Sequence, residues 1–162
     1  MLKKAFIVTN NDILRRLRFI ENINNFEVAS IFKLSHLCVD EGTIHKWLQK
    51  DDHPDYLFIN DEDFSLFLNG LITKYRGAKE DSPLIPEKKL TNNIVLKKII
   101  IAYSLKSDEV IEILKLADFR IGKSELSAFF RKADHKNYRE CKSQILRNFL
   151  MGLQIKKSQK EK

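Results

Sequence analysis

The chain contains the same segment twice, and this repeat constrains the fold more than any other feature of the sequence. When the sequence is shifted by 82 positions, residues 10–71 align with residues 92–153 without a gap, and 16 of the 62 aligned pairs are identical. Common solenoid repeats have shorter periods, of roughly 20 to 50 residues. The alignment therefore predicts a small domain that has been duplicated, rather than a repeat array.

The repeat divides the 162 residues into five segments. These are an N-terminal extension (1–9), repeat 1 (10–71), a linker (72–91), repeat 2 (92–153) and a basic tail (154–162). The linker is polar and contains Gly, Ser and two Pro residues, a composition typical of flexible connections. Fully extended, it would reach roughly 60 Å, enough to hold two separate heads one DNA turn apart.

Within each repeat, apolar residues recur at helical spacing in four segments. In the last of these, Phe64, Phe67, Leu68 and Leu71 stand at positions i, i+3, i+4 and i+7, on one face of a helix. Aromatic residues at this spacing, including Trp47, are expected in the core rather than on a base-stacking surface. No segment of comparable length alternates strictly between polar and apolar residues. The sequence therefore predicts an all-α fold, a tandem duplication of a four-helix, helix-turn-helix-like unit.

Polar residues at the predicted helix starts fit the N-cap role, in which a side chain accepts from an unpaired N–H of the first turn. We expect such caps in the Asn pair that opens each repeat. Before the second helix we expect them at Asn25 and Ser107. Before the third helix, Asp40 and Gly122 stand between apolar residues at hydrophobic-staple spacing.

The charge of the chain is distributed unevenly between the repeats. The whole sequence has a net charge of +7 and a pI near 9.4, which suits a polyanionic partner such as nucleic acid. Repeat 1 carries six basic and eleven acidic side chains, whereas repeat 2 carries twelve basic and seven acidic. We therefore expect any nucleic-acid surface to lie mainly on repeat 2, because the acidic groups of repeat 1 would repel phosphates.

The second and third helices of each repeat are joined by only a few residues, as in a helix-turn-helix motif. If the third helix of repeat 2 reads DNA, its exposed Arg, Lys and Ser side chains would supply donors for phosphates and base edges. Against this interpretation, bulky residues occupy the turn and no Gly is present there. The candidate nucleic-acid contacts are Lys123, Ser124, Ser127, Arg131, Lys132, Lys136 and Arg139.

A second motif, Lys-x-Asp-His-x-x-Tyr, occurs in both repeats between the third and fourth helices. An Asp beside a His could orient an imidazole for acid–base chemistry or bind a metal. The alternative, which we favour, is structural: His and Asp cap helix ends and Tyr packs across the turn. The motif residues are Lys50, Asp52, His53 and Tyr56 in repeat 1 and Lys132, Asp134, His135 and Tyr138 in repeat 2.

The remaining chemistry-bearing residues give no catalytic signature. Cys38 and Cys141 are far apart and lack the spacing of a zinc site or of a disulfide framework. The repeats share no Ser or Cys nucleophile. We therefore expect no enzyme, no cofactor and no metal.

The N-terminal segment lacks the features of a targeting sequence. Its four consecutive apolar residues, Ala5 to Val8, are too few for a secretory signal, and no run approaches the length that spans a bilayer. We therefore expect a cytoplasmic protein without membrane attachment.

Three stretches resemble a known family: residues 10–18, residues 92–98 and the run Asp134-His-Lys-Asn-Tyr-Arg-Glu-Cys141. They are similar to the YehS-type family of small bacterial proteins, and the resemblance covers nearly the whole chain. It implies a bacterial, cytoplasmic setting. The biochemical role of that family is unassigned, so the resemblance supplies no functional residues.

These observations lead us to expect a non-enzymatic regulatory or accessory protein whose repeats form a pseudo-twofold pair, with DNA or RNA bound through repeat 2. The alternative is a protein-interaction module that presents helical grooves or its oppositely charged repeat surfaces to a partner. In that alternative the acidic repeat could also dock on the basic repeat, within one chain or between two copies.

Overall fold

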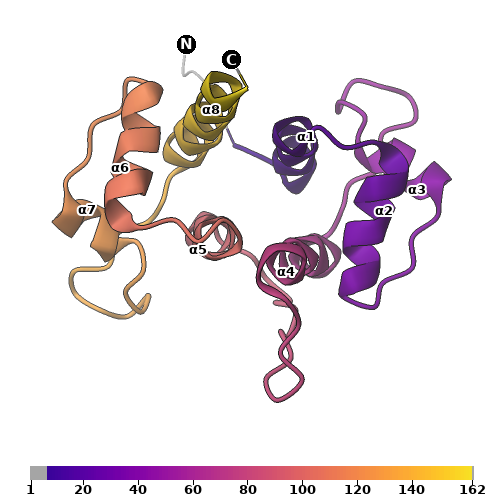
Figure 1. The fold of residues 1–162 in the computed structure, drawn as a ribbon, viewed down its shortest axis with the longest axis horizontal. Helices are drawn as coiled ribbons and strands as arrows, with labels where there is room; N and C mark the ends of the chain where they lie inside the picture. The colour runs from indigo at the N-terminus through magenta and orange to yellow at the C-terminus, as the bar shows by residue number, and fades with distance from the viewer. Residues whose placement is uncertain (1–6, 162) are drawn as a thin grey trace, which may run out of the picture.

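The computed structural model describes residues 7–161, so most of the N-terminal extension (1–9) and the last residue of the tail lie outside the described residues. Within 7–161 the chain forms α-helices and no strand, which confirms the all-α prediction (Figure 1). Repeat 1 contains α1 (Asn10–Glu21), α2 (Asn25–Leu34), α3 (Glu41–Trp47) and α4 (Asp61–Arg76). Repeat 2 contains α5 (Asn92–Ala102), α6 (Ser107–Leu116), α7 (Lys123–Ala128) and α8 (Ser143–Lys160).

The two repeats have the same helical topology. Each helix of repeat 2 begins 82 residues after its counterpart in repeat 1, in agreement with the sequence alignment. The backbone conformations agree as well, because left-handed residues occur at equivalent positions: Asn22 with Ser104, and His36 with Asp118. The predicted duplication is therefore confirmed at the level of the fold.

The repeats pack directly on each other through four helices. Figure 1 shows α1, α4, α5 and α8 in the middle of the molecule, with α2 and α3 on one side and α6 and α7 on the other. Between the repeats, α4 packs on α5 and α1 packs on α8, so each repeat offers its first and fourth helix to the other. This reciprocal arrangement is that of a pseudo-twofold pair within one chain.

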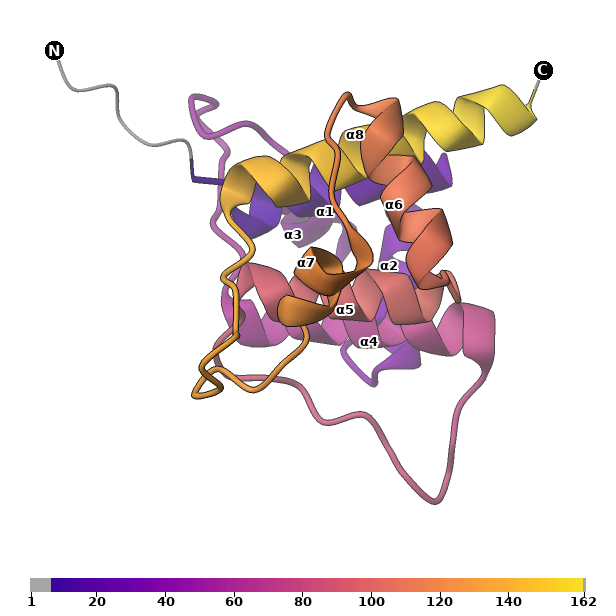
Figure 2. The same cartoon turned by 90° about the vertical axis from the view of Figure 1, so that its left-hand side faces the viewer.

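The expectation that the linker holds two separate heads apart is wrong. Residues 77–91 form a non-helical loop that projects from one edge while the repeats stay in contact (Figure 2). The first part of the predicted linker is the end of α4, which runs to Arg76. The tail expected at 154–162 is also mostly helical, because α8 continues to Lys160.

The core of each repeat is apolar and aromatic, as the periodicity predicts. In repeat 1, Phe32 lies 5.2 Å from Phe67 and 5.4 Å from Trp47 between ring centroids. The fourth helix of each repeat approaches the second closely at Gly70 and Gly152, where a Cβ atom would lie about 2 Å from the carbonyl oxygen of Ile31 or Ile113. These glycines therefore permit a helix contact that no other residue would allow.

The helix caps differ from the predicted ones in part. Asp40 and Gly122 are the N-caps of α3 and α7, as expected. The Asn pairs lie inside the first turns instead, after the N-caps Thr9 and Thr91. The caps of α2 and α6 are Asn24 and Lys106, each one residue before the predicted position.

Candidate functional site

The turn that follows α6 in repeat 2 (residues 117–121) contains no glycine, and Gly122 comes only after it, as the N-cap of α7. Asp118 adopts the left-handed conformation, with a φ of 58°, and the N–H of Phe119 donates to the carbonyl of Leu114 at 3.0 Å. Asp supplies the conformation that glycine often supplies after a helix, and it does so because short polar side chains tolerate it. The bulky turn residues therefore do not prevent a tight connection. However, α7 has only six residues, which is short for a helix that reads a DNA groove.

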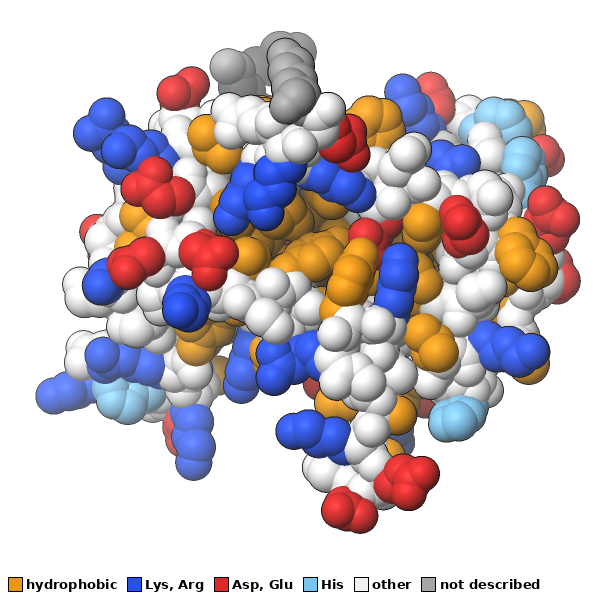
Figure 3. All heavy atoms as spheres, viewed as in Figure 1, with side chains coloured by type: hydrophobic (Ala, Val, Ile, Leu, Met, Phe, Trp, Pro, Cys, Tyr) orange, Lys and Arg blue, Asp and Glu red, His pale blue; other side chains and the backbone are white. Residues whose placement is uncertain are grey.

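All seven candidate nucleic-acid contacts are exposed, and they come from α7 and the loop that follows it. Figure 3 shows Lys and Arg side chains gathered over this loop, at the lower left. Two of the cations are already paired: Lys123 lies 3.1 Å from Asp108, and Arg139 lies 2.9 Å from Glu125.

Three cations of this region remain without an acidic partner. Arg131, Lys132 and Lys136 are exposed and make no ion pair within residues 7–161. They lie within six consecutive positions of one loop, whose backbone is held by a hydrogen bond from the N–H of Arg139 to the carbonyl of Ala128 (3.1 Å). The structure therefore presents a compact group of cations, which we call the repeat 2 basic loop (Arg131, Lys132 and Lys136).

The equivalent loop of repeat 1 has the opposite character. It carries Asp51, Asp52 and Asp55, which are all exposed, where repeat 2 has Ala133, Asp134 and Asn137. The two loops belong to opposite sides of the molecule, beside α3 and α7 (Figure 1). The repeats therefore pack through their central helices, and the acidic loop does not dock on the basic loop within the chain.

The repeated Lys-x-Asp-His-x-x-Tyr motif forms a turn in both repeats. The Nδ1 atoms of His53 and His135 accept hydrogen bonds at 3.0 Å from the backbone N–H two residues later. Both imidazoles are exposed, as are Asp52 and Asp134, and neither Asp caps a helix. The geometry supports a structural role, although the contacts are turn contacts rather than the helix caps that we expected.

Within the described part of the chain, no group of three or more His, Cys, Asp or Glu residues could hold a metal.

The Asn pair that opens each repeat has a role that the sequence reasoning missed. Asn11 is fully buried, and its side-chain amide donates to the carbonyls of Trp47 (2.9 Å) and Leu57 (2.8 Å). Its Oδ1 atom accepts from the N–H of Ile59 at 3.2 Å. Asn93 makes the equivalent contacts in repeat 2 with Phe129, Arg139 and Cys141. The buried asparagines therefore fasten the loop after the third helix, including the basic loop, to the core.

The cysteines differ in environment. Cys38 is exposed, whereas Cys141 is buried beside Asn93. Burial raises the pKa of the Cys141 thiol to about 12, so this group stays protonated and unreactive near neutral pH. Both are free thiols, as the sequence predicts.

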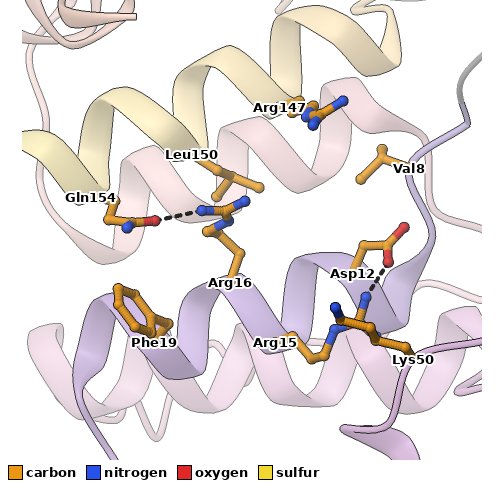
Figure 4. Close-up of a pocket in the computed structure, with 9 residues that line it drawn as sticks. All are labelled: Val8, Asp12, Arg15, Arg16, Phe19, Lys50, Arg147, Leu150 and Gln154. Carbon is orange, nitrogen blue, oxygen red and sulfur yellow. Dashed lines mark hydrogen bonds and ion pairs between the residues drawn. The ribbon is translucent and has the colours of Figure 1, made fainter. Parts of the chain in front are cut away.

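A cleft lies between α1 and α8, at one of the two contacts between the repeats (Figure 4). Its volume is about 470 Å³, within the usual range for ligand pockets. Four cations line it: Arg15 and Arg16 from α1, Arg147 from α8, and Lys50 from the loop after α3. Sequence reasoning did not find this group, because its members come from both repeats and meet only through the tertiary packing.

The family model described as "Protein of unknown function (DUF1456)" matches the chain twice, at residues 10–77 and 92–158. The chain is also 44% identical over 145 residues to the protein "Uncharacterized protein YehS" of Escherichia coli (strain K12), covering 89% of this chain and 93% of that protein. No solved structure matches the chain. Within the described residues, no helix is long and apolar enough to cross a membrane.

The two matches to the family model and the similarity to YehS confirm the resemblance seen in the sequence. The chain belongs to the DUF1456 family, with two copies of the family module.

Proposed function

We propose that this chain is a non-enzymatic regulatory or accessory protein that binds nucleic acid through repeat 2. The observation that carries the proposal is the repeat 2 basic loop, three exposed cations without acidic partners on a backbone that the buried Asn93 fastens to the core. Exposed Arg and Lys side chains make many of the phosphate contacts in such complexes, and these contacts supply much of the affinity.

The contrast with repeat 1 supports the same assignment. The two loops share one backbone framework, yet only the loop of repeat 2 can approach a phosphate backbone without repulsion from several carboxylates. The hydroxyls of Ser124 and Ser127 on α7 are exposed beside the loop and could donate to phosphates as well. Because α7 is short, we expect mainly phosphate contacts and little reading of base sequence.

The test is fluorescence anisotropy of a labelled DNA duplex, with a single strand of the same length as a second probe. For about three phosphate contacts, affinity should fall by about 40-fold between roughly 50 and 200 mM salt. The double variant Arg131→Glu with Lys132→Glu should abolish most of the binding. The matched control, Lys33→Glu with Lys46→Glu, makes the same charge change on exposed lysines of repeat 1 and should bind nearly as the unmodified protein does.

Two results would refute the proposal. One is the absence of binding to both probes at low salt. The other is binding that both double variants weaken to the same degree, since that would reflect net charge rather than a site on repeat 2.

A protein partner is the second candidate, and the distribution of exposed apolar side chains favours repeat 1 as its site. Phe19, Phe26, Leu34, Leu57 and Phe58 are exposed there, whereas in repeat 2 only Ile101 and Met151 are exposed among the large apolar residues described. Contiguous exposed apolar groups mark interaction surfaces, so this candidate requires that these side chains act together as one patch. This candidate predicts that a partner is recovered from nuclease-treated extracts and is lost with Phe26→Ser and Phe58→Ser.

A further inference from the structure

The loop between the repeats is attached to the helices at few points. Residues 77–91 project beyond α4 at one edge of the molecule (Figure 2). Within the described residues, the hydrogen bonds and the ion pair that join residues 78–90 to the helices all involve Glu87 or Leu90. Release of the loop therefore depends on a very small number of groups.

Buried polar side chains lie where the loop meets the contact between the repeats. Ser65 and Asn69 of α4 are 0% and 2% exposed, and Lys98 of α5 is 8% exposed. Lysine is seldom buried, because its charge loses the stabilisation that water provides. A buried ammonium group at this contact therefore needs an anion beside it.

Glu87 of the loop supplies that anion. Its Oε2 atom accepts a hydrogen bond from the hydroxyl of Ser65 and lies 3.1 Å from the Nζ atom of Lys98. The N–H of Glu87 also donates to the Oγ atom of Ser65, at 2.9 Å. Burial alone would raise the pKa of Glu87, but the hydrogen bonds from Ser65 and Lys98 outweigh this effect and hold the pKa below its usual range. The loop thus provides an ionised internal ligand for a group of buried donors.

Glu87 does not satisfy all of these donors. The Oδ1 atom of Asn69 accepts from Lys98, whereas its Nδ2 atom is buried and has no partner within the described residues. Glu87 uses only Oε2 for both of its side-chain contacts with the helices, and its side chain remains 32% exposed. The donor group is therefore partly unsatisfied, and it is not sealed from solvent on the side of the loop.

We infer that Ser65, Asn69 and Lys98 form a carboxylate-binding site at the contact between the repeats, which Glu87 occupies as a releasable internal ligand. A carboxylate from outside the chain, on a small acid or on an acidic peptide, takes the place of Glu87 and frees the loop. An internal ligand on a short flexible segment competes as if it were present at millimolar concentration, so an external carboxylate can displace it. The site uses none of the residues of the repeat 2 basic loop, so it stands or falls separately from the proposed function.

The experiment is an NMR titration of the isotope-labelled full chain carrying Glu87→Ala, which vacates the site. The probes are sodium acetate and a peptide with the sequence of residues 82–89, each compared with sodium chloride at equal ionic strength. We expect both carboxylates, but not chloride, to shift the side-chain amide signal of Asn69 and the backbone amide signal of Ser65. The unmodified protein should bind both probes about tenfold more weakly or less, because Glu87 competes for the site.

Matched variants separate the site from general effects of charge. Glu80→Ala removes an exposed carboxylate from the same loop and should behave as the unmodified protein does. Adding Lys98→Met to Glu87→Ala should abolish the response to both probes. A peptide with Glu87→Gln should not bind. Acetate that binds as tightly as the peptide identifies a small acid as sufficient, whereas tighter binding of the peptide identifies an acidic segment as the better ligand.

Thermal unfolding shows whether each variant is folded. Glu87→Gln keeps the size of the side chain, provides a second variant with a weakened internal ligand, and should bind acetate with an intermediate affinity. In the unmodified protein, acetate should speed hydrogen exchange of the N–H of Glu87, because the loop is released. The inference is overturned if no carboxylate shifts the Asn69 signal in either variant, if chloride has the same effect as acetate, or if the unmodified protein responds as strongly as Glu87→Ala.

Discussion

Repeat 1 and repeat 2 keep the same internal contacts while their surfaces have diverged in charge. The asparagine that holds the loop after the third helix and the glycine at the contact between the second and fourth helices occur in both. The same loop carries exposed aspartates in one repeat and unpaired cations in the other. The comparison shows that the repeats share a small set of buried groups, while the exposed positions of the loop differ in charge.

The largest effects are expected at the helix-contact glycines. Gly70→Ala and Gly152→Ala would each place a methyl group about 2 Å from a backbone carbonyl. Backbone cannot move aside as a flexible side chain can, so we expect each variant to lose about 3 kcal/mol of unfolding free energy, measured by urea denaturation. Gly42→Ala in α3 meets only the side chain of Asp40, at 3.2 Å, and should change stability by less than about 0.5 kcal/mol.

The buried asparagines should come next. Asn11→Ala leaves the carbonyls of Trp47 and Leu57 and the N–H of Ile59 without their partner, and we expect a loss of about 2 kcal/mol. Asn93→Ala should cost a similar amount if the two repeats are equivalent. Parallel denaturation curves give the unfolding free energy of each variant. If the two losses differ by more than about 1 kcal/mol, the buried asparagines do not contribute equally to the two repeats.

A smaller effect should distinguish the two contacts between repeats. Glu87→Gln removes the carboxylate at the α4–α5 contact, and we expect a loss of about 1 kcal/mol at pH 7. Because folding lowers the pKa of Glu87, this contribution is complete above about pH 4.3 and disappears as the pH falls through the lower pKa of the folded protein.

The stabilities of Glu87→Gln and the unmodified protein should therefore converge in acid, as followed by denaturation at several pH values. Glu80→Gln changes an exposed carboxylate of the same loop and serves as the control. A gap between Glu87→Gln and the unmodified protein that stays constant as the pH falls would contradict the assigned role of Glu87.

The sequence predicts the helices well because their apolar spacing is local, and the internal alignment provides a second, independent copy of each one. It also predicts the exposed cations of repeat 2, since charged side chains rarely lie in a core. It misses the roles of Asn11 and Asn93, because their partners lie 36 to 48 residues away along the chain. The cleft between α1 and α8 is missed for the same reason, since Arg16 and Gln154 are 138 positions apart.

The proposal that the loop of repeat 2, and not the loop of repeat 1, binds nucleic acid is tested most directly by backbone NMR of the full chain during titration with a DNA duplex. We predict shift changes confined to residues 123–139, with residues 41–57 of repeat 1 unaffected. Changes that are equal in both loops, or that are larger in repeat 1, would contradict the assignment of nucleic-acid binding to repeat 2.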